Sequence, residues 1–171
     1  MICTGEGGAI LTSREEFSQW LDIKLRHGAS RRDEVGMIFD DFGYNFRLTN
    51  IHAALGVAQL EQLPGILERK RKIFHRYQTT LNNLDAFTIA NVPDYADNNH
   101  WMNILQIKQN KHGEDRESLM RILNNSGIQT RPVWHPNHLQ RPFNTNFSYK
   151  VENALELVNS SLCIPSSTSL T

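Results

Sequence analysis

The strongest constraint on the fold is a change of pattern near residue 84. Before it, apolar residues recur at helical spacing, and only the first dozen residues read as strands. After it, short strand-like segments alternate with helical ones. The sequence therefore predicts a mixed α/β protein in two parts, residues 1–84 and 85–171. The first part holds too few strands to cover the apolar faces of its helices, so we expect those strands to belong to a larger sheet.

The opening stretch, MICTGEGGAILT, predicts a β-hairpin. Gly7 and Gly8 would supply the positive φ angles that a tight hairpin turn needs. Glycine amides can also hold a phosphate. However, no helix begins at these glycines and no Gly-Lys-Ser/Thr sequence follows them, so we favour the turn.

Three helices are expected before residue 84. Ser13 and Glu16 have the spacing of a capping box, and His27-Gly28 is a typical helix stop. A second helix begins near Thr49, and Pro64 is placed to begin a third that runs to residue 84. Residues 29–48 show no period, which is typical of a functional or mobile segment.

The second part reads as a small α/β domain with the order β-β-α-β-α-β. Each segment carries apolar residues at the period of a strand or a helix, and Gly127 marks the end of the first helix. The expected segments are strands 86–92 and 100–108, helix 113–127, strand 128–134, helix 148–161 and strand 162–165.

Composition excludes several classes of function. Lys+Arg and Asp+Glu both number 18, so no net charge attracts nucleic acid or an anionic membrane. No apolar run is long enough to cross a bilayer and the start does not resemble a signal peptide, so we expect a cytoplasmic protein. Cys3 and Cys163 are too few for a disulfide framework or a zinc site, and we expect buried, reduced thiols.

The segment GYNFRLTN (residues 43–50) is the first candidate site. Asn45 and Arg47 stand two apart, between aromatic residues and ahead of a helix cap, and could present polar groups to an anion. Alternatively, Asn45 bonds to the loop backbone and Arg47 pairs with Asp40 or Asp41. The residues alone leave both interpretations open.

The segment TRPVWHPNHLQRPF (residues 130–143) is the second candidate. His135 and His138 have a metal-ligand spacing, but three prolines exclude a regular helix and the loop has no carboxylate, so we predict no metal. Its aromatic and cationic residues suit a sugar-like or phosphorylated ligand. The alternative is that Trp134 and Phe143 only pack. No spacing supports a Ser-His-Asp or Cys-His arrangement.

Taken in order, the motifs resemble the C-terminal half of the DegT/DnrJ/EryC1/StrS sugar aminotransferases, enzymes of fold type I that use pyridoxal phosphate (PLP). The resemblance covers essentially the whole chain, and its most diagnostic part is GYNFRLTNIHAALGVAQLEQL. The form TRPVWHPNHLQRPF is similar to the branch that aminates nucleotide-linked keto sugars for bacillosamine- or legionaminic-type surface glycans.

The resemblance implies a fold and an activity. Residues 1–84 would be the C-terminal part of the large PLP-binding domain, ending in a linking helix, and residues 85–171 the small C-terminal α/β domain. The enzyme would be a homodimer in cell-surface polysaccharide biosynthesis. An amino donor, typically glutamate, would load the cofactor, and a nucleotide-linked keto sugar would accept the amino group.

The resemblance also implies roles for individual residues. Asn45 matches an asparagine that, in many members, reaches across the dimer interface to the partner's PLP phosphate, and Arg47 matches the adjacent basic position. His138 matches the histidine of the family's PxH loop near the sugar nucleotide. Arg131 and Trp134 flank that loop as further substrate-binding candidates.

The lysine that holds PLP as a Schiff base lies, in this family, just before the strand that contains TGEGG. Alignment on Thr4–Gly8 places it immediately before Met1, and Lys24 cannot replace it by alignment. We therefore expect no catalytic residue in these 171 residues, and no activity of the isolated chain. The alternatives are a PLP-dependent sugar dehydratase with histidine in place of the lysine, or a non-catalytic sugar-nucleotide binding or assembly module.

Overall fold

The computed structural model describes residues 2–33, 36–39, 41–108, 113 and 115–170. By compactness the chain divides into two units, Met1–Leu63 and Pro64–Thr171, and each is described separately below. The division falls inside a helix. The domain boundary at residue 84 stays a prediction.

The first unit contains helix α1 (Glu15–Leu25), the antiparallel strands β1 (Ala29–Asp33) and β2 (Gly36–Phe39), and the beginning of helix α2 (Asn50–Leu81). The predicted first helix is confirmed, but its capping box is wrong. Arg14 is the N-cap and has no side-chain cap bond. The N–H of Arg14 donates to the hydroxyl of Thr12 at 3.1 Å, so the chain turns into the helix one residue later than Ser13.

The hairpin predicted at the start of the chain is also wrong. Residues 2–12 form no strand. The N–H of Cys3 instead donates to the side-chain oxygen of Gln59 at 2.8 Å, and the Gln59 amide donates back to the Cys3 carbonyl. An isolated two-stranded hairpin is marginal in water, and here one side-chain carboxamide bonds where a neighbouring strand would. Cys3 is exposed, contrary to expectation, whereas Cys163 is buried as predicted, and burial raises the pKa of its thiol.

The aperiodic segment 29–48 contains the β1–β2 hairpin, which the sequence did not predict. Strand β1 reads ASRRD, which has no alternation of apolar and polar residues to mark it as a strand. Its pairing is defined by main-chain register, from Ala29 opposite Phe39 to Asp33 opposite Gly36.

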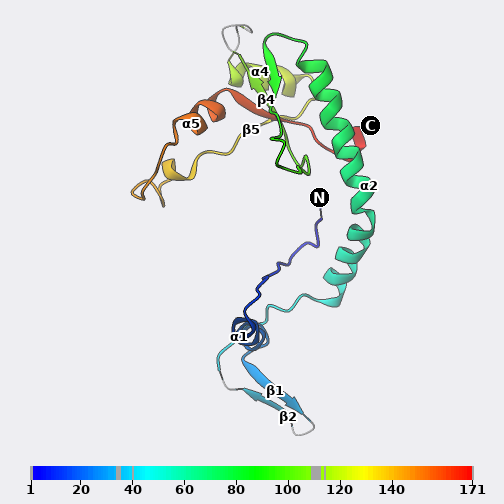
Figure 1. The fold of residues 1–171 in the computed structure, drawn as a ribbon, viewed down its shortest axis with the longest axis vertical. Helices are drawn as coiled ribbons and strands as arrows, with labels where there is room; N and C mark the ends of the chain where they lie inside the picture. Colours follow the sequence, from blue (N-terminus) through cyan, green and yellow to red (C-terminus); the bar gives the residue numbers. More distant parts are fainter. Residues whose placement is uncertain (1, 34–35, 40, 109–112, 114, 171) are drawn as a thin grey trace. The chain divides into compact units, whose positions relative to one another are not determined.

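Helix α2 is a single helix of 32 residues, so the prediction that a new helix starts at Pro64 is wrong (Figure 1). Proline inside a helix removes one hydrogen bond, which the long helical segments on both sides tolerate. All buried residues of α2 lie after Pro64, namely Lys70, Ile73 and Phe74. The half before Pro64 exposes large apolar side chains, as expected for a helix without enough sheet to cover it: Ile51, Leu55, Val57 and Leu60.

The second unit has the predicted order of elements. Its antiparallel sheet runs β3-β4-β6-β5. Helix α4 begins where the Asp115 side chain accepts the N–H of Ser118 at 2.8 Å, and Gly127 follows its end with φ of 79°. The elements are β3 (Phe87–Ile89), β4 (Asn103–Ile107), α4 (Arg116–Asn125), β5 (Arg131–Pro132), the 3-10 turn η1 (Asn137–Leu139), α5 (Glu152–Asn159), β6 (Ser161–Ile164) and the 3-10 turn η2 (Thr168–Leu170).

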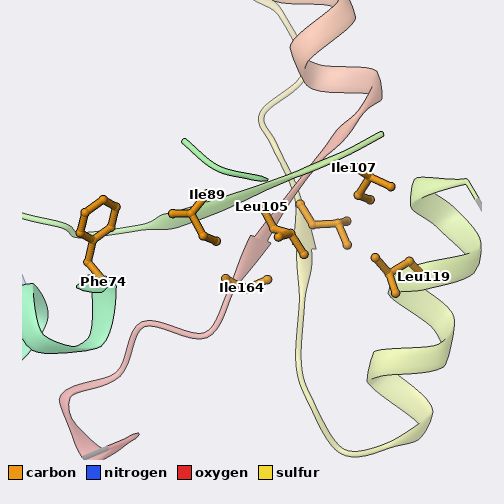
Figure 2. Close-up of a cluster of buried hydrophobic side chains, with 7 residues drawn as sticks. Phe74, Ile89, Leu105, Ile107, Leu119 and Ile164 are labelled. Carbon is orange, nitrogen blue, oxygen red and sulfur yellow. The ribbon is translucent and has the colours of Figure 1, made fainter. Parts of the chain in front are cut away.

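One apolar cluster holds this unit together. Figure 2 shows Phe74 of α2 and Leu119 of α4 approaching strand side chains of the sheet. Strand β4 buries alternate residues, as a strand with one face on a core does. The buried strand members are Ile89, Leu105, Ile107, Leu162 and Ile164. Among the described residues, no helix is long and apolar enough to span a membrane.

His100 is a buried titratable residue at the edge of this core. Its ring stacks on Phe74 with centroids 4.2 Å apart. Burial lowers the pKa of His100, and the nearby His75 and Arg71 lower it further, against a small opposite effect of Asp97. The folded protein therefore favours the neutral imidazole.

We predict that stability falls at acid pH because of His100. The unfolded chain takes up the proton first, near the ordinary histidine pKa of about 6.5, so the free energy of unfolding decreases as pH falls below that value. Urea denaturation at pH 8 and pH 5 measures the difference. His100→Asn is the matched variant, because asparagine tolerates the positive φ of 49° at this position. If the variant lost as much free energy of unfolding between pH 8 and pH 5 as the unmodified protein does, the prediction would be contradicted.

Candidate functional site

The first candidate site lies where the main chain at Gly28 packs directly against the main chain at Asp41–Gly43. Helix α1 ends as predicted, with Gly28 at φ of 81° and its N–H donating to the Ile23 carbonyl at 2.9 Å. A Cβ atom on Gly28 would lie 1.7 Å from the carbonyl oxygen of Asp41, and one on Gly43 would lie 2.1 Å from the Gly28 nitrogen. No side chain fits at either position, so the end of α1 and residues 41–43 are in direct main-chain contact.

The loop that follows this crossing caps α1. The N–H of Tyr44 donates to the Lys24 carbonyl at 2.7 Å, and the N–H of Phe46 donates to the Leu25 carbonyl at 3.3 Å. These are carbonyls that the helix end itself leaves without partners. Asn45, between the two donors, forms an isolated bridge with Arg26. Main-chain bonds therefore hold Asn45 in place, and its carboxamide has no hydrogen-bond partner in the described part of the chain.

Lys24 also holds this loop through its side chain. Its ammonium lies 2.5 Å from an Asp41 carboxylate oxygen and donates to the Phe42 carbonyl at 3.0 Å. The hydrogen bond from Lys24 and that from the Phe42 N–H hold the pKa of the Asp41 carboxyl below its usual value. Asp41 thus pairs with Lys24 and not with Arg47, while Asp40 lies outside the described residues.

The side chains of Asn45 and Arg47 remain available for a ligand. Among the described residues, neither has a hydrogen-bond or ion-pair partner for its side chain. Both line a pocket of about 590 Å³ together with Glu6–Ile10, Leu48 and His52. The structure thus brings the glycine-rich start of the chain to the GYNFRLTN motif.

The glycines of the first segment allow this close approach. Gly5 and Gly7 have φ of 83° and 139°, whereas the sequence pointed to Gly7 and Gly8. A Cβ atom on Gly7 would lie 3.0 Å from a methyl of Leu48. The segment is therefore not only a turn, because it forms one wall of the pocket that Asn45 and Arg47 line.

The second candidate site lies in the second unit. His138, on η1, lines a pocket of about 420 Å³. Its Nε2 is buried and has no hydrogen-bond partner among the described residues. Sequence reasoning missed Phe147 and Tyr149, which line the same pocket with rings stacked 6.4 Å apart. The signal was two aromatic residues two apart, in NFSYK.

The other two substrate-binding candidates lie outside the lining of that pocket. Arg131 is exposed on β5, and Trp134 is half-exposed, with its ring 5.7 Å from that of Trp101. Asn45 and Arg47 belong to the other unit, so the structure describes the two groups of residues separately. In the described part of the chain, no three His, Cys, Asp or Glu side chains are grouped so as to hold a metal ion.

The donors of the first pocket fit the phosphate of PLP. A guanidinium and a carboxamide, both without partners among the described residues, suit a dianionic group better than a neutral one. Glycine main chain at the opposite wall leaves room for it. Among the described residues, no lysine lines this pocket, so these residues would hold the phosphate and not the aldehyde of the cofactor.

The comparisons with known proteins agree with this fold. The chain belongs to the DegT/DnrJ/EryC1/StrS aminotransferase family, whose model matches residues 1–171. It is 32% identical to EpsN of Bacillus subtilis (strain 168) over 178 residues, covering 99% of the chain and 44% of EpsN. It is 35% identical to the GDP-perosamine synthase of Escherichia coli O157:H7 over 138 residues, covering 80% of the chain and 36% of that enzyme.

A solved structure matches as well. The sugar aminotransferase CalS13 from Micromonospora echinospora superposes with a TM-score of 0.81 at 24% identity, over 99% of the chain and 45% of CalS13. The predicted mixed α/β fold of a PLP-dependent sugar aminotransferase is thus confirmed, and so is the family resemblance. The chain spans less than half the length of the relatives it matches.

We predict that Gly28→Ala disrupts the first site. The added Cβ overlaps the Asp41 carbonyl and the left-handed φ adds strain, so the first unit should lose more than about 2 kcal/mol of stability. Hydrogen exchange of the Tyr44 and Phe46 amides, together with urea denaturation, measures the effect. Gly65→Ala is the matched control, since nothing lies within 4 Å of its added Cβ and alanine favours a helix. Unchanged protection of both amides from hydrogen exchange in Gly28→Ala would refute the main-chain contact between Gly28 and residues 41–43.

Proposed function

We propose that this chain is part of an enzyme that transfers an amino group from glutamate to a nucleotide-linked keto sugar, with PLP as cofactor. Membership of the aminotransferase family supports the reaction class. The observation that carries the proposal is the pocket that Glu6–Ile10 line together with Asn45 and Arg47, whose side chains have no partner among the described residues. The name of the 35%-identical GDP-perosamine synthase supports a nucleotide-linked sugar.

PLP, when bound, supplies the electron-withdrawing ring that makes proton transfer at the donor's Cα feasible. In this proposal the chain's own residues bind and orient. The Asn45 carboxamide would donate to a phosphate oxygen of the cofactor held by the partner in a homodimer. The Arg47 guanidinium offsets the phosphate charge. The main-chain bonds of Tyr44 and Phe46 to α1 hold the backbone of this loop, so binding has to order only the two side chains.

His138, Arg131 and Trp134 bind the sugar nucleotide in this proposal. A buried imidazole nitrogen without a partner costs free energy, which fits a position whose partner comes with a ligand or with the rest of the enzyme. Exposed Arg131 carries positive charge suited to a diphosphate. The family branch that makes bacillosamine- or legionaminic-type glycans, a role in cell-surface polysaccharide biosynthesis and a cytoplasmic location complete the proposal.

The proposal assigns the covalent attachment of PLP to a lysine outside these 171 residues. Lys24 is a poor substitute, because its ammonium is paired with Asp41 and bound to a main-chain carbonyl. A protonated, ion-paired amine is not a nucleophile. The 171-residue chain on its own is therefore proposed to be inactive.

We predict that the chain alone does not attach PLP at one defined lysine. After incubation with PLP and reduction with borohydride, peptide mass spectrometry should find no stoichiometric label. Lys24→Gln, which removes the one lysine of residues 1–63, serves as the control and should give the same result. A full label on Lys24 in the unmodified chain would refute the assignment.

The whole protein, meaning this chain joined to the lysine-bearing segment, tests the function itself. With PLP, glutamate and a GDP- or UDP-linked 4-keto sugar, it should form the amino sugar, detected by mass spectrometry. Failure with both nucleotides would refute the proposed function.

The roles of Asn45 and Arg47 are tested in the same protein. Asn45→Ala and Arg47→Gln should each weaken PLP binding by about 1.5–3 kcal/mol, the range of a hydrogen bond to a charged group. Pyridoxal, which lacks the phosphate, is the matched ligand, and its affinity should not change. Equal losses for PLP and pyridoxal would show that these residues act on something other than the phosphate.

A further inference from the structure

Two tryptophans form an exposed pair in the second unit. Trp101 and Trp134 come from separate loops, and their ring centroids lie 5.7 Å apart at an interplanar angle of 30°. Trp101 is 54% exposed and Trp134 58% exposed. Tryptophan is usually well buried, so two neighbouring exposed rings form a surface suited to a ligand.

The main chain of Trp101 is anchored by a buried lysine. Lys70 of α2 is only 8% exposed. Its ammonium donates to the Ser166 carbonyl, to the Ser166 hydroxyl at 3.3 Å and to the Trp101 carbonyl at 3.5 Å. The Ser166 hydroxyl donates to the same Trp101 carbonyl at 2.7 Å. Lys70, Ser166 and Trp101 thus form one network, with the Trp101 carbonyl accepting from both other residues.

Packing alone does not explain why a lysine occupies this position, because burying its ammonium is energetically unfavourable. Within the described residues, Lys70 has no carboxylate partner, and burial lowers the pKa of its ammonium. A buried charge without a counter-charge is unfavourable, and an apolar side chain of similar length would fill the space without that cost. What the lysine adds is three directed donors, all used on Ser166 and Trp101.

We propose that Lys70 is a positioning residue: through Ser166 and the Trp101 carbonyl it fixes Trp101 beside Trp134, and the paired rings form a platform on which the base of a nucleotide stacks. The inference rests on the proposed function, because it concerns the base of the nucleotide-linked sugar. Flat heterocycles stack on aromatic side chains with little dependence on sequence or substituent. Arg131 supplies positive charge on the same segment as Trp134, and its guanidinium has no partner in the described part of the chain.

The chain allows a clean optical test. It has three tryptophans, so Trp20→Phe leaves only the proposed pair. Two indoles at this separation couple and give an exciton signal in circular dichroism. We expect that signal in the Trp20→Phe protein and expect Trp101→Leu to abolish it.

The network is tested in the same Trp20→Phe background. Lys70→Met and Ser166→Ala should weaken the exciton signal, while Ser166→Thr, which keeps the hydroxyl, should retain it. Titration with GDP and with UDP, followed by tryptophan fluorescence, measures binding. Lys70→Met, Ser166→Ala and Trp101→Leu should each raise Kd about tenfold, since stacking of one base contributes roughly 1–3 kcal/mol.

Several results would overturn the proposal. An exciton signal unchanged in both Lys70→Met and Ser166→Ala would refute the positioning role. Two variants are used so that the test still holds if one of them fails to fold. A Kd unchanged in Trp101→Leu, or no binding of either nucleotide by the Trp20→Phe chain, removes the platform. Failure of the proposed function is separate: nucleotide binding that depends on Lys70, in a protein that forms no amino sugar, would refute the reaction and leave the platform standing.

Discussion

The direct contact between Gly28 and the segment 41–43 is the constraint on which the first site depends. Because no side chain separates them, the carbonyls at the end of α1 come within reach of the Tyr44 and Phe46 amides. Those bonds define the path of the loop and place Asn45 and Arg47 beside the glycine-rich start of the chain. The Lys24–Asp41 ion pair braces the same loop from its other end.

The second unit was predictable from sequence because its signals are local. Strand β4 buries alternate residues, and Asp115 and Gly127 bound α4 by ordinary capping chemistry. The first unit was less predictable, because its hydrogen bonds join residues that are far apart in the sequence. Residues 2–12 have a strand-like pattern but form no strand, and Cys3 bonds to Gln59. The polar strand β1 has no apolar period at all. Proline is favoured at the start of a helix, but Pro64 lies inside the long helix α2.

For the candidate sites too, some residues could be predicted from the sequence and others could not. The residue pattern of GYNFRLTN singled out Asn45 and Arg47, and the family resemblance singled out His138; the roles of all three stay predictions. Their surroundings could not be predicted from the sequence. Nothing near Lys24 in the sequence points to Asp41, and nothing near Lys70 points to Ser166. Contacts of this kind join residues far apart in the chain, so only the fold reveals them.

The capping of α1 by a later loop has a consequence for the length of that helix. Inserting one residue into α1 would turn the carbonyls of Lys24 and Leu25 by about 100° around the helix axis. The loop bound to those carbonyls would have to rotate with them or detach, and would take Asn45 and Arg47 away from the pocket. Substitutions on the exposed face of α1 change no such geometry. Apart from Lys24, whose side chain holds the loop, the number of residues in α1 therefore matters more to the site than their identity.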